Sequence, residues 1–381
     1  MSLLKSRFIE MFKNSETLRL DQIAEVTMGQ SPDSSSYNSV GKGIPFYQGK
    51  TEFTDKYIGQ PSTWCTSPTR IAKENDILMS VRAPVGNVNI ATEECCIGRG
   101  LSSIRPQNGF NSEFIFEALE QKKEELENKA TGSTFKAINK DIVLSIQIPN
   151  TSISIQKEYS NFVKQIDKSK FLLQQILEKL ELLKKSRFIE LIGNIQNPKY
   201  QLVELNEICE FIKDGTHQTP IYTEDRVNGF KFLSSKDVTS QKINWSNIKY
   251  IPKELHEQLY AKLSPKRGDI LLAKNGTTGV AAVVDSDEIF DIYVSLALLR
   301  PKSGVNVSYL CSALNSEDLK RQFNSSLKGI GVPNLHLREI KKARIIFPPI
   351  DIQNKISSIT EQIDKSKLII QKTLEDLVGK V

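Results

Sequence analysis

Residues 165–170 read Gln165-Ile166-Asp167-Lys168-Ser169-Lys170, and residues 362–367 repeat this hexapeptide without change. A second hexapeptide, Lys-Ser-Arg-Phe-Ile-Glu, occupies residues 5–10 and returns at residues 185–190. Identical runs of six residues seldom arise by chance in an ordered protein. The two pairs therefore indicate an internal duplication, and the rest of the chain is best understood from it.

Both copies of the first hexapeptide lie on long helical patterns. Apolar or small residues recur at spacings of three and four, as they do along the a/d seam of a coiled coil. The first stripe is Tyr159, Phe162, Ile166, Ser169, Leu173, Ile176, Leu180 and Leu183, and the second is Ile356, Ile359, Ile363, Ser366, Ile370, Thr373 and Leu377. A single stripe would more often be a helix packed on its own domain. Two matching stripes instead favour a pair of long antiparallel helices, and a helix that spans residues 156–192 would be roughly 55 Å long.

The duplication is circular. When the copies are aligned on the first hexapeptide, Val381 falls opposite Lys184. The residues that would come next are the Lys-Ser-Arg-Phe-Ile-Glu that the N-terminus carries. We therefore predict that residues 1–15 form a helix completing the C-terminal repeat, and that the two chain ends meet.

The segments between the helices follow one common order. An Asp-Ile-Leu run at residues 76–78 returns at 269–271, and a later run ends in Arg-Pro at 105–106 and again at 300–301. Short β-branched runs bounded by Gly, Pro, Asn and Asp predict mostly β domains with a few helices.

The predicted fold class is α+β with a pseudo-two-fold circular repeat. Its five segments are an N-terminal helix (1–15), a first mostly β domain (16–154), a central long helix (155–195), a second mostly β domain (196–350) and a C-terminal long helix (351–381).

The composition predicts a cytoplasmic protein. At 381 residues the chain fits two or three domains, and its charged start does not look like an export signal. No run approaches the roughly 18 apolar residues of a membrane span. The five cysteines include no Cys-x-x-Cys pair, which is typical of reduced, buried thiols. Three scattered histidines do not predict a metal site.

Across essentially the whole chain, this arrangement resembles the specificity subunits of type I restriction–modification enzymes. Those subunits carry two variable target-recognition domains separated and closed by two repeated helices. Three phrases also resemble the family: Asp-Gly-Thr-His-Gln-Thr-Pro at 214–220, Gly-Ile-Gly-Val-Pro-Asn-Leu at 329–335, and Gly-Ser-Thr-Phe-Lys-Ala-Ile at 132–138. Their order within a duplicated frame carries more weight than any one phrase.

The resemblance implies a non-catalytic subunit that binds double-stranded DNA. Each domain would read one half of a bipartite, asymmetric site, while the helices set the spacer and dock two modification subunits. Restriction or motor subunits would join the complex. The complex would be an adenine-N6 DNA methyltransferase and ATP-dependent endonuclease. S-adenosylmethionine, ATP and Mg²⁺ would be bound by the partners, and no cofactor by this chain.

The candidate DNA contacts lie in loops at matching places of the two domains. Arg and Lys recognise guanine, Asn and Gln recognise adenine, and hydroxyls and amides contact phosphate. The candidates are Gln30, Ser31, Gln48, Lys50, Arg82, Lys136 and Asn139 in the first domain, and Lys213, Thr216, His217, Gln218, Lys236, Lys274, Asn275, Asn334 and His336 in the second. We expect most from Lys50, Arg82, Lys236, Lys274 and Asn275. Any single candidate is more often a solvated surface residue, or for Asn334, His336 and His217 a structural loop residue, so the prediction concerns the set.

Two other classes of protein were weighed. A fused methyltransferase or nuclease is disfavoured, because the only Pro-Pro is flanked by Phe347 and Ile350 rather than by a catalytic motif, and no Gly-x-Gly-x-x-Gly loop follows a strand. A coiled-coil scaffold or oligomerisation protein without DNA specificity fits the repeated stripe equally well. A salt-dependent, sequence-specific affinity for duplex DNA in the presence of a modification partner would distinguish it from the DNA-reading subunit.

Overall fold

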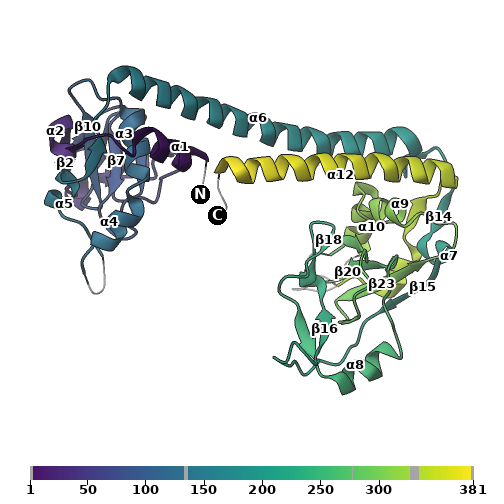
Figure 1. Cartoon of the computed structure of the whole chain (residues 1–381). Helices are drawn as coiled ribbons and strands as arrows, with labels where there is room; N and C mark the ends of the chain where they lie inside the picture. The colour runs from purple at the N-terminus through teal and green to yellow at the C-terminus, as the bar shows by residue number, and fades with distance from the viewer. Residues whose placement is uncertain (1–2, 133–135, 277, 327–333, 379–381) are drawn as a thin grey trace. The chain divides into compact units, whose positions relative to one another are not determined.

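The computed structural model describes residues 3–132, 136–276, 278–326 and 334–378. The chain divides into two compact units: unit 1 comprises residues 1–174 and 371–381, and unit 2 comprises residues 175–370. Helices and strands are mixed, as the α+β class requires, and two helices are much longer than the rest, α6 (Ile153–Ile192) and α12 (Ile350–Val378) (Figure 1). Within the described ranges, no helix combines the length and the apolar character needed to cross a membrane.

Unit 1 contains two larger sheets and one two-stranded sheet. The main sheet is antiparallel with the order β2-β10-β7-β8, and the second sheet has the order β3-β5-β4-β9-β6, in which β4 and β9 run parallel. The strands are β1 (Thr17–Arg19), β2 (Ala24–Met28), β3 (Tyr37–Asn38), β4 (Ile44–Tyr47), β5 (Trp64–Cys65), β6 (Ile71–Ala72), β7 (Ile77–Ser80), β8 (Val88–Ile90), β9 (Cys95–Ile97), β10 (Leu101–Pro106) and β11 (Gln147–Pro149). The shorter helices are α1 (Leu3–Phe12), α2 (Leu20–Ile23), η1 (Ser34–Ser36), α3 (Ser112–Glu120), α4 (Lys123–Lys129) and α5 (Lys140–Leu144).

Unit 2 repeats this strand order. Its main sheet has the order β15-β23-β20-β21, and β16 pairs with β22 in parallel as β4 does with β9. The strands are β12 (Gly193–Asn194), β13 (Asn197–Pro198), β14 (Leu202–Glu204), β15 (Cys209–Asp214), β16 (Phe230–Leu233), β17 (Val238–Thr239), β18 (Lys242–Ile243), β19 (Lys249–Ile251), β20 (Ile270–Ala273), β21 (Ala281–Val283), β22 (Phe290–Ile292), β23 (Leu296–Pro301) and β24 (Arg344–Ile346). The shorter helices are α7 (Leu205–Ile208), η2 (Ser235–Asp237), α8 (Lys253–Tyr260), α9 (Val307–Leu314), α10 (Glu317–Ser326) and α11 (Leu337–Lys342).

In each unit an arginine of one main-sheet strand forms an ion pair with a buried aspartate that precedes the neighbouring strand. Asp76 lies just before β7 and accepts hydrogen bonds from the Arg105 side chain at 2.9 and 2.8 Å. Asp269 lies just before β20 and accepts the same bonds from Arg300 at 2.8 and 2.7 Å. Both carboxylates are almost completely buried. The Asp-Ile-Leu and Arg-Pro runs of the two copies thus meet in the folded protein.

Asparagine caps begin the helix that covers each main sheet. Asn111 accepts hydrogen bonds from the backbone amides of Glu113 and Phe114 at the start of α3, and Asn306 accepts one from Tyr309 in α9. Such a cap stabilises a helix by about 1 kcal/mol. The backbone N–H of each asparagine donates at 2.9 Å to a glutamine at the start of a long helix, Gln156 of α6 or Gln353 of α12.

The N-terminal helix packs on unit 1 as the end of α6 packs on unit 2. Phe8 of α1 lies with its ring centroid 6.2 Å from Phe114 of α3, while Phe188 of α6 lies 6.1 Å from Tyr309 of α9. Residues 1–2 and 379–381 lie outside the described residues. The expected meeting of the two chain ends therefore stays a prediction.

The two long helices contact each other in unit 2 through charged side chains. Lys184 donates to both carboxylate oxygens of Asp364 at 3.1 Å, and Lys367 donates to Glu181. The lower-numbered residue of α6, Glu181, pairs with the higher-numbered residue of α12, Lys367. The two helices therefore run antiparallel where these pairs form.

Burial corrects part of the predicted seam. The polar members Ser169, Ser366 and Thr373 are exposed, as are Ile176 and Leu183, which are 43% and 46% exposed. The half-buried residues that replace them are Lys170 and Leu177 in α6, their counterparts Lys367 and Leu374 in α12, and Lys184 in α6. Lysine stems pack along such a face while their ammonium groups reach water or a carboxylate, so the true seam includes lysines that an apolar pattern misses.

The cysteine prediction is confirmed. All five cysteines are free and buried. Burial raises the pKa of the Cys95 and Cys209 thiols to about 12, so they are uncharged near neutral pH.

A buried carboxyl group lies where α3 packs near α6 in unit 1. Glu117 is 7% exposed, and burial raises its pKa from 4.5 to about 7, although the Lys56 ammonium opposes the shift. Lys56 itself lies 3.9 Å from both Glu113 and Asp167 and so has two other carboxylates to neutralise.

Unit 1 is expected to lose stability as the pH rises from about 4.5 to about 7. Over this range the folded protein keeps the Glu117 proton while the unfolded chain releases it, so up to about 3 kcal/mol of the free energy of unfolding is lost. Urea unfolding of the full chain, followed by Trp64 fluorescence in a Trp245→Phe background, measures this change. Glu117→Gln stays neutral and should not show it, so equal pH profiles for the two proteins would contradict the prediction.

Candidate nucleic-acid interface

Five loops of unit 1 meet at one end of its sheets. They are residues 29–31, 48–50, 81–83, 98–100 and 136–139, and we call them loop cluster 1. Backbone hydrogen bonds tie them together: Gly29 N–H to Leu101 O at 2.9 Å, Gly98 N–H to Tyr47 O at 2.8 Å, Val81 N–H to Gly100 O at 2.9 Å, and Ile138 N–H to Val81 O at 3.0 Å. Residues far apart in the sequence therefore share one rigid frame.

The same frame recurs in unit 2. Its loops are residues 215–218, 234–236, 274–276, 293–295 and 334–336, which we call loop cluster 2. The matching hydrogen bonds are Gly215 N–H to Leu296 O at 3.3 Å, Tyr293 N–H to Leu233 O at 2.8 Å, Lys274 N–H to Ser295 O at 2.8 Å, and Leu335 N–H to Lys274 O at 3.1 Å. Each bond of one cluster thus has a counterpart in the other.

Close backbone contact explains the glycine in Asp-Gly-Thr-His. A Cβ atom on Gly215 would lie 1.9 Å from the carbonyl oxygen of Ile292 in β22. Gly215→Ala is expected to lower the free energy of unfolding of unit 2 by about 1–3 kcal/mol, because the loop must move away from β22. Urea unfolding followed by Trp245 measures this. Gly49→Ala is the matched control, because no atom lies within 4 Å of its added Cβ. Equal, small effects of both variants would count against the tight frame.

All seven candidates of the first domain lie in loop cluster 1. Ser31 donates to the side-chain oxygen of Gln48 at 2.9 Å, and the chain at Arg82 pairs with Ala137, next to Lys136. Gln30, Gln48, Arg82, Lys136 and Asn139 are exposed, whereas Ser31 and Lys50 are half-buried. The Asn139 side-chain oxygen accepts a hydrogen bond from the backbone N–H of Ile142 and so caps α5. This oxygen therefore has a structural partner already.

Eight of the nine candidates of the second domain lie in loop cluster 2. His217, Gln218, Lys236 and His336 are exposed, and Thr216, Asn275 and Asn334 are half-buried. Asn275 pairs with Asn334 across an antiparallel bridge, as Arg82 does with Ala137. His336 occupies the N-cap position of α11 but makes no side-chain cap. Lys213 lies outside the cluster, in β15, with its ammonium 5.1 Å from the centre of the Phe211 ring.

The expectation for Lys274 needs correction. Its side chain is buried, and its ammonium donates to Asp214 at 2.6 Å. The lysine neutralises the aspartate of the Asp-Gly-Thr-His loop, so its charge is not free to bind a phosphate. His217 Nε2 lies 3.6 Å from the same carboxylate. The His217 side chain is nevertheless 75% exposed.

The sequence interpretation missed one loop of each cluster, residues 98–100 and 293–295. The first is a Gly-Arg-Gly turn that ends β9, and its Arg99 is exposed. The signal was present in the sequence, because an arginine between two glycines fits a tight turn better than a strand.

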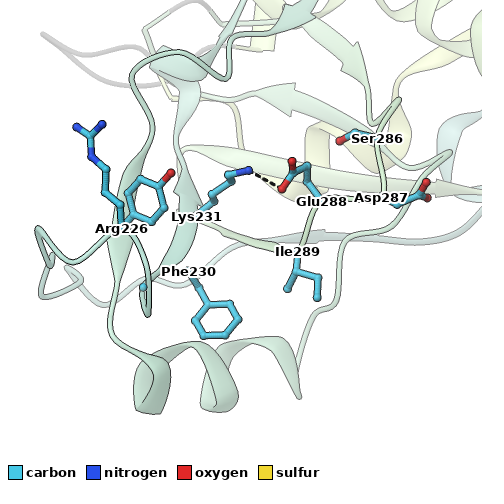
Figure 2. Close-up of a pocket in the computed structure, with 9 residues that line it drawn as sticks. Arg226, Phe230, Lys231, Ser286, Asp287, Glu288 and Ile289 are labelled. Atoms are coloured by element: carbon cyan, nitrogen blue, oxygen red, sulfur yellow. Dashed lines mark hydrogen bonds and ion pairs between the residues drawn. The ribbon is translucent and has the colours of Figure 1, made fainter.

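A hollow of about 680 Å³ lies at the other end of β16 from loop cluster 2 (Figure 2). It is lined by Arg226, Gly229, Phe230, Lys231, Tyr250, Ser286, Asp287, Glu288 and Ile289. Its acids already have partners, since Lys231 binds Glu288 and Arg267 binds Asp287. None of the predicted contacts lines this hollow.

The protein-family model described as type I restriction modification DNA specificity domain matches the chain twice, over residues 13–182 and 197–378. The "putative type I restriction enzyme MjaX specificity subunit" of Methanocaldococcus jannaschii is 41% identical over 169 residues, a match that covers 44% of this chain and only 40% of that relative. The "type I restriction enzyme MjaIX specificity subunit" of the same organism is 23% identical over 97% of this chain and 93% of its own length.

A third relative, the "type I restriction enzyme EcoBI specificity subunit" of Escherichia coli, is 21% identical over 96% of this chain and 82% of its own length. Among solved structures, the type I restriction–modification system S subunit from M. genitalium matches with a TM-score of 0.51 at 17% identity, over 96% of this chain and 93% of that one. That likeness establishes the fold. With two copies of the domain recognised over most of its length, the chain belongs to the family of type I restriction–modification specificity subunits.

Proposed function

We propose that this chain is the non-catalytic DNA-reading subunit of a type I restriction–modification complex. Its two recognition domains, residues 16–154 and 196–350, each read one half of a bipartite site through loop clusters 1 and 2. The observation that carries this proposal is one hydrogen-bonded frame, present twice, that displays different side chains. Arg82 of cluster 1 stands where cluster 2 has Asn275, and Ser31 stands where it has His217.

Different side chains on equal frames imply different half-sites. Arginine prefers guanine and asparagine prefers adenine, so the bases read by the two clusters should differ and the full site should not be a palindrome. Exposed Lys136 and Lys236 supply positive charge for phosphates on the two clusters.

The two long helices set the spacing between the half-sites in this proposal. At 40 residues, α6 extends over roughly 60 Å at 1.5 Å per residue. The ion pairs Lys184–Asp364 and Glu181–Lys367 between α6 and α12 support an antiparallel coiled coil with pseudo-two-fold symmetry. A rigid rod of this kind fixes how many unread base pairs separate the contacted ones.

The long helices also offer docking surfaces for two modification subunits. Large apolar side chains stay exposed on α6, which is unusual for a helix that only spans solvent. In unit 1 they are Ile153, Ile155, Phe171 and Leu172, and in unit 2 they are Ile176, Leu182, Leu183 and Ile189.

In this proposal the chemistry belongs to the partner subunits. They would bind S-adenosylmethionine for adenine methylation, and restriction or motor subunits would use ATP and Mg²⁺. The complex would act on DNA in the cytoplasm.

Binding of the purified complex to DNA tests the proposal. With modification subunits present, the chain should confer at least about a thousandfold preference for its split site over an unrelated duplex, with an affinity that falls steeply as salt rises. Modification subunits without this chain are the control. A scaffold without DNA specificity would give equal affinities for both duplexes, and that result would contradict the proposal.

A further inference from the structure

The turn at residues 98–100 lies at the centre of loop cluster 1. Three other loops of the cluster hold it: Gly100 N–H donates to Gln48 O at 3.2 Å, Gly100 O accepts the N–H of Val81, and Arg99 N–H donates to Ser31 Oγ at 3.4 Å. The turn is therefore fixed from three sides, and whatever it displays has a defined position.

Arg99 is the one side chain that this turn displays. The flanking glycines press against the neighbouring loop, where a Cβ on Gly98 would lie 2.9 Å from Gln48 Cα and a Cβ on Gly100 would lie 2.5 Å from Gln48 O. Larger residues cannot replace them without moving the Gln48 loop. The packing leaves room for a side chain only between them.

The Arg99 guanidinium is free. It is exposed, and no carboxylate of the described residues forms an ion pair with it. Three other arginines of unit 1 do form ion pairs, Arg7 with Glu10, Arg19 with Asp21 and Arg105 with Asp76. A free guanidinium on a rigid turn offers the paired donors that match O6 and N7 of guanine in the major groove.

Unit 2 has a valine at the same position. Val294 N–H donates to Thr216 O at 3.0 Å, and the turn is held by Tyr293 N–H to Leu233 O and by Lys274 N–H to Ser295 O. Val294 is half-buried and has no side-chain donor. The central position therefore presents a hydrogen-bond donor in one cluster and an apolar surface in the other.

We infer that Arg99 is a specificity-determining residue that contacts a guanine in the half-site read by unit 1. Arg99 and Val294 occupy equivalent positions in the two units. Their different side chains would then select different bases in the two half-sites. This inference rests on the proposed function, and the two can fail separately.

Exchanging the two residues tests the inference. In cells that carry the modification subunits, Arg99→Val should turn one guanine of one half-site into a position that tolerates any base, with the other half unchanged, as shown by single-molecule sequencing of methylated DNA. The purified complex should lose roughly tenfold to a hundredfold in its preference for the guanine-bearing duplex. The reciprocal Val294→Arg should add a guanine preference to the other half.

Two further variants make the result decisive. Arg19→Val removes an equal charge from a surface pair of unit 1 and should leave the motif intact. Arg99→Lys keeps the charge but not the paired donors, so it should relax the same base without changing the salt dependence. The Trp64 unfolding midpoint of Arg99→Val should match that of the unaltered chain.

Three outcomes are distinguishable. An unchanged motif and unchanged preference in Arg99→Val would overturn the assignment. So would an equal loss of affinity for all duplexes with a shallower salt dependence, which would identify a phosphate contact. If the unaltered complex methylates no split motif, the proposed function itself fails.

Discussion

Arg300→Leu is expected to lower the free energy of unfolding of unit 2 by about 3–5 kcal/mol. The Arg300 side chain donates two hydrogen bonds to Asp269, which is 1% exposed and would stay buried without a charged partner. The backbone N–H of Lys266, 2.9 Å from the Asp269 carboxylate, would remain as a donor but carries no charge. Urea unfolding of Trp64→Phe, which leaves Trp245 of unit 2 as the reporter, measures the effect.

The matched control for this variant is Arg267→Leu. Arg267 also forms a two-bond pair with a carboxylate, that of Asp287, but both side chains are more than half exposed. Its loss should therefore change the free energy of unfolding far less than the loss of Arg300, because solvent screens an exposed pair. Similar effects of the two variants would show that burial of Asp269 does not determine the strength of this pair.

Phe8→Ala is expected to destabilise unit 1 by about 3–5 kcal/mol and to leave unit 2 unchanged. Phe8 is 7% exposed and packs among Phe12, Phe114 and Tyr159, with ring centroids 4.8, 6.2 and 5.3 Å away. Truncation would open a cavity where α1 completes the unit. Trp64 fluorescence in a Trp245→Phe background reports unit 1, and Trp245 in a Trp64→Phe background reports unit 2.

Ile9→Ala is the control on the same helix. Ile9 is 45% exposed, so its truncation should change the stability of unit 1 by less than about 1 kcal/mol. If Phe8→Ala has as small an effect as Ile9→Ala, the N-terminal helix does not complete unit 1, and the circular plan loses its support.

The duplication could be predicted because identical residues recur in both copies. The repeated hexapeptides predict the long helices. The Asp-Ile-Leu and Arg-Pro runs predict strands, which pair in the same order in both units. The helix seam was less accessible. Its half-buried positions include Lys184 and Lys367, whose carboxylate partners lie on the other helix, and no periodicity of apolar residues can reveal such a pair.

The candidate loops were found by position, but their side chains could not all be judged from sequence. Lys274 looked like a free loop cation, yet its partner Asp214 lies 60 residues earlier in the chain. Arg99 was overlooked although it lies between two glycines, just two residues after the buried strand β9. Whether a loop cation is free or paired depends on which distant loops fold beside it, and that information lies in the tertiary structure.

The central claim is that one subunit reads two unlike half-sites on a duplicated frame. Single-molecule sequencing of methylated DNA, from a strain with its modification subunits expressed and with this gene present or deleted, tests it most directly. Deletion should abolish methylation at a single split motif whose halves differ in sequence. A methylation pattern that survives deletion intact, or a lost motif with identical halves, would contradict the account.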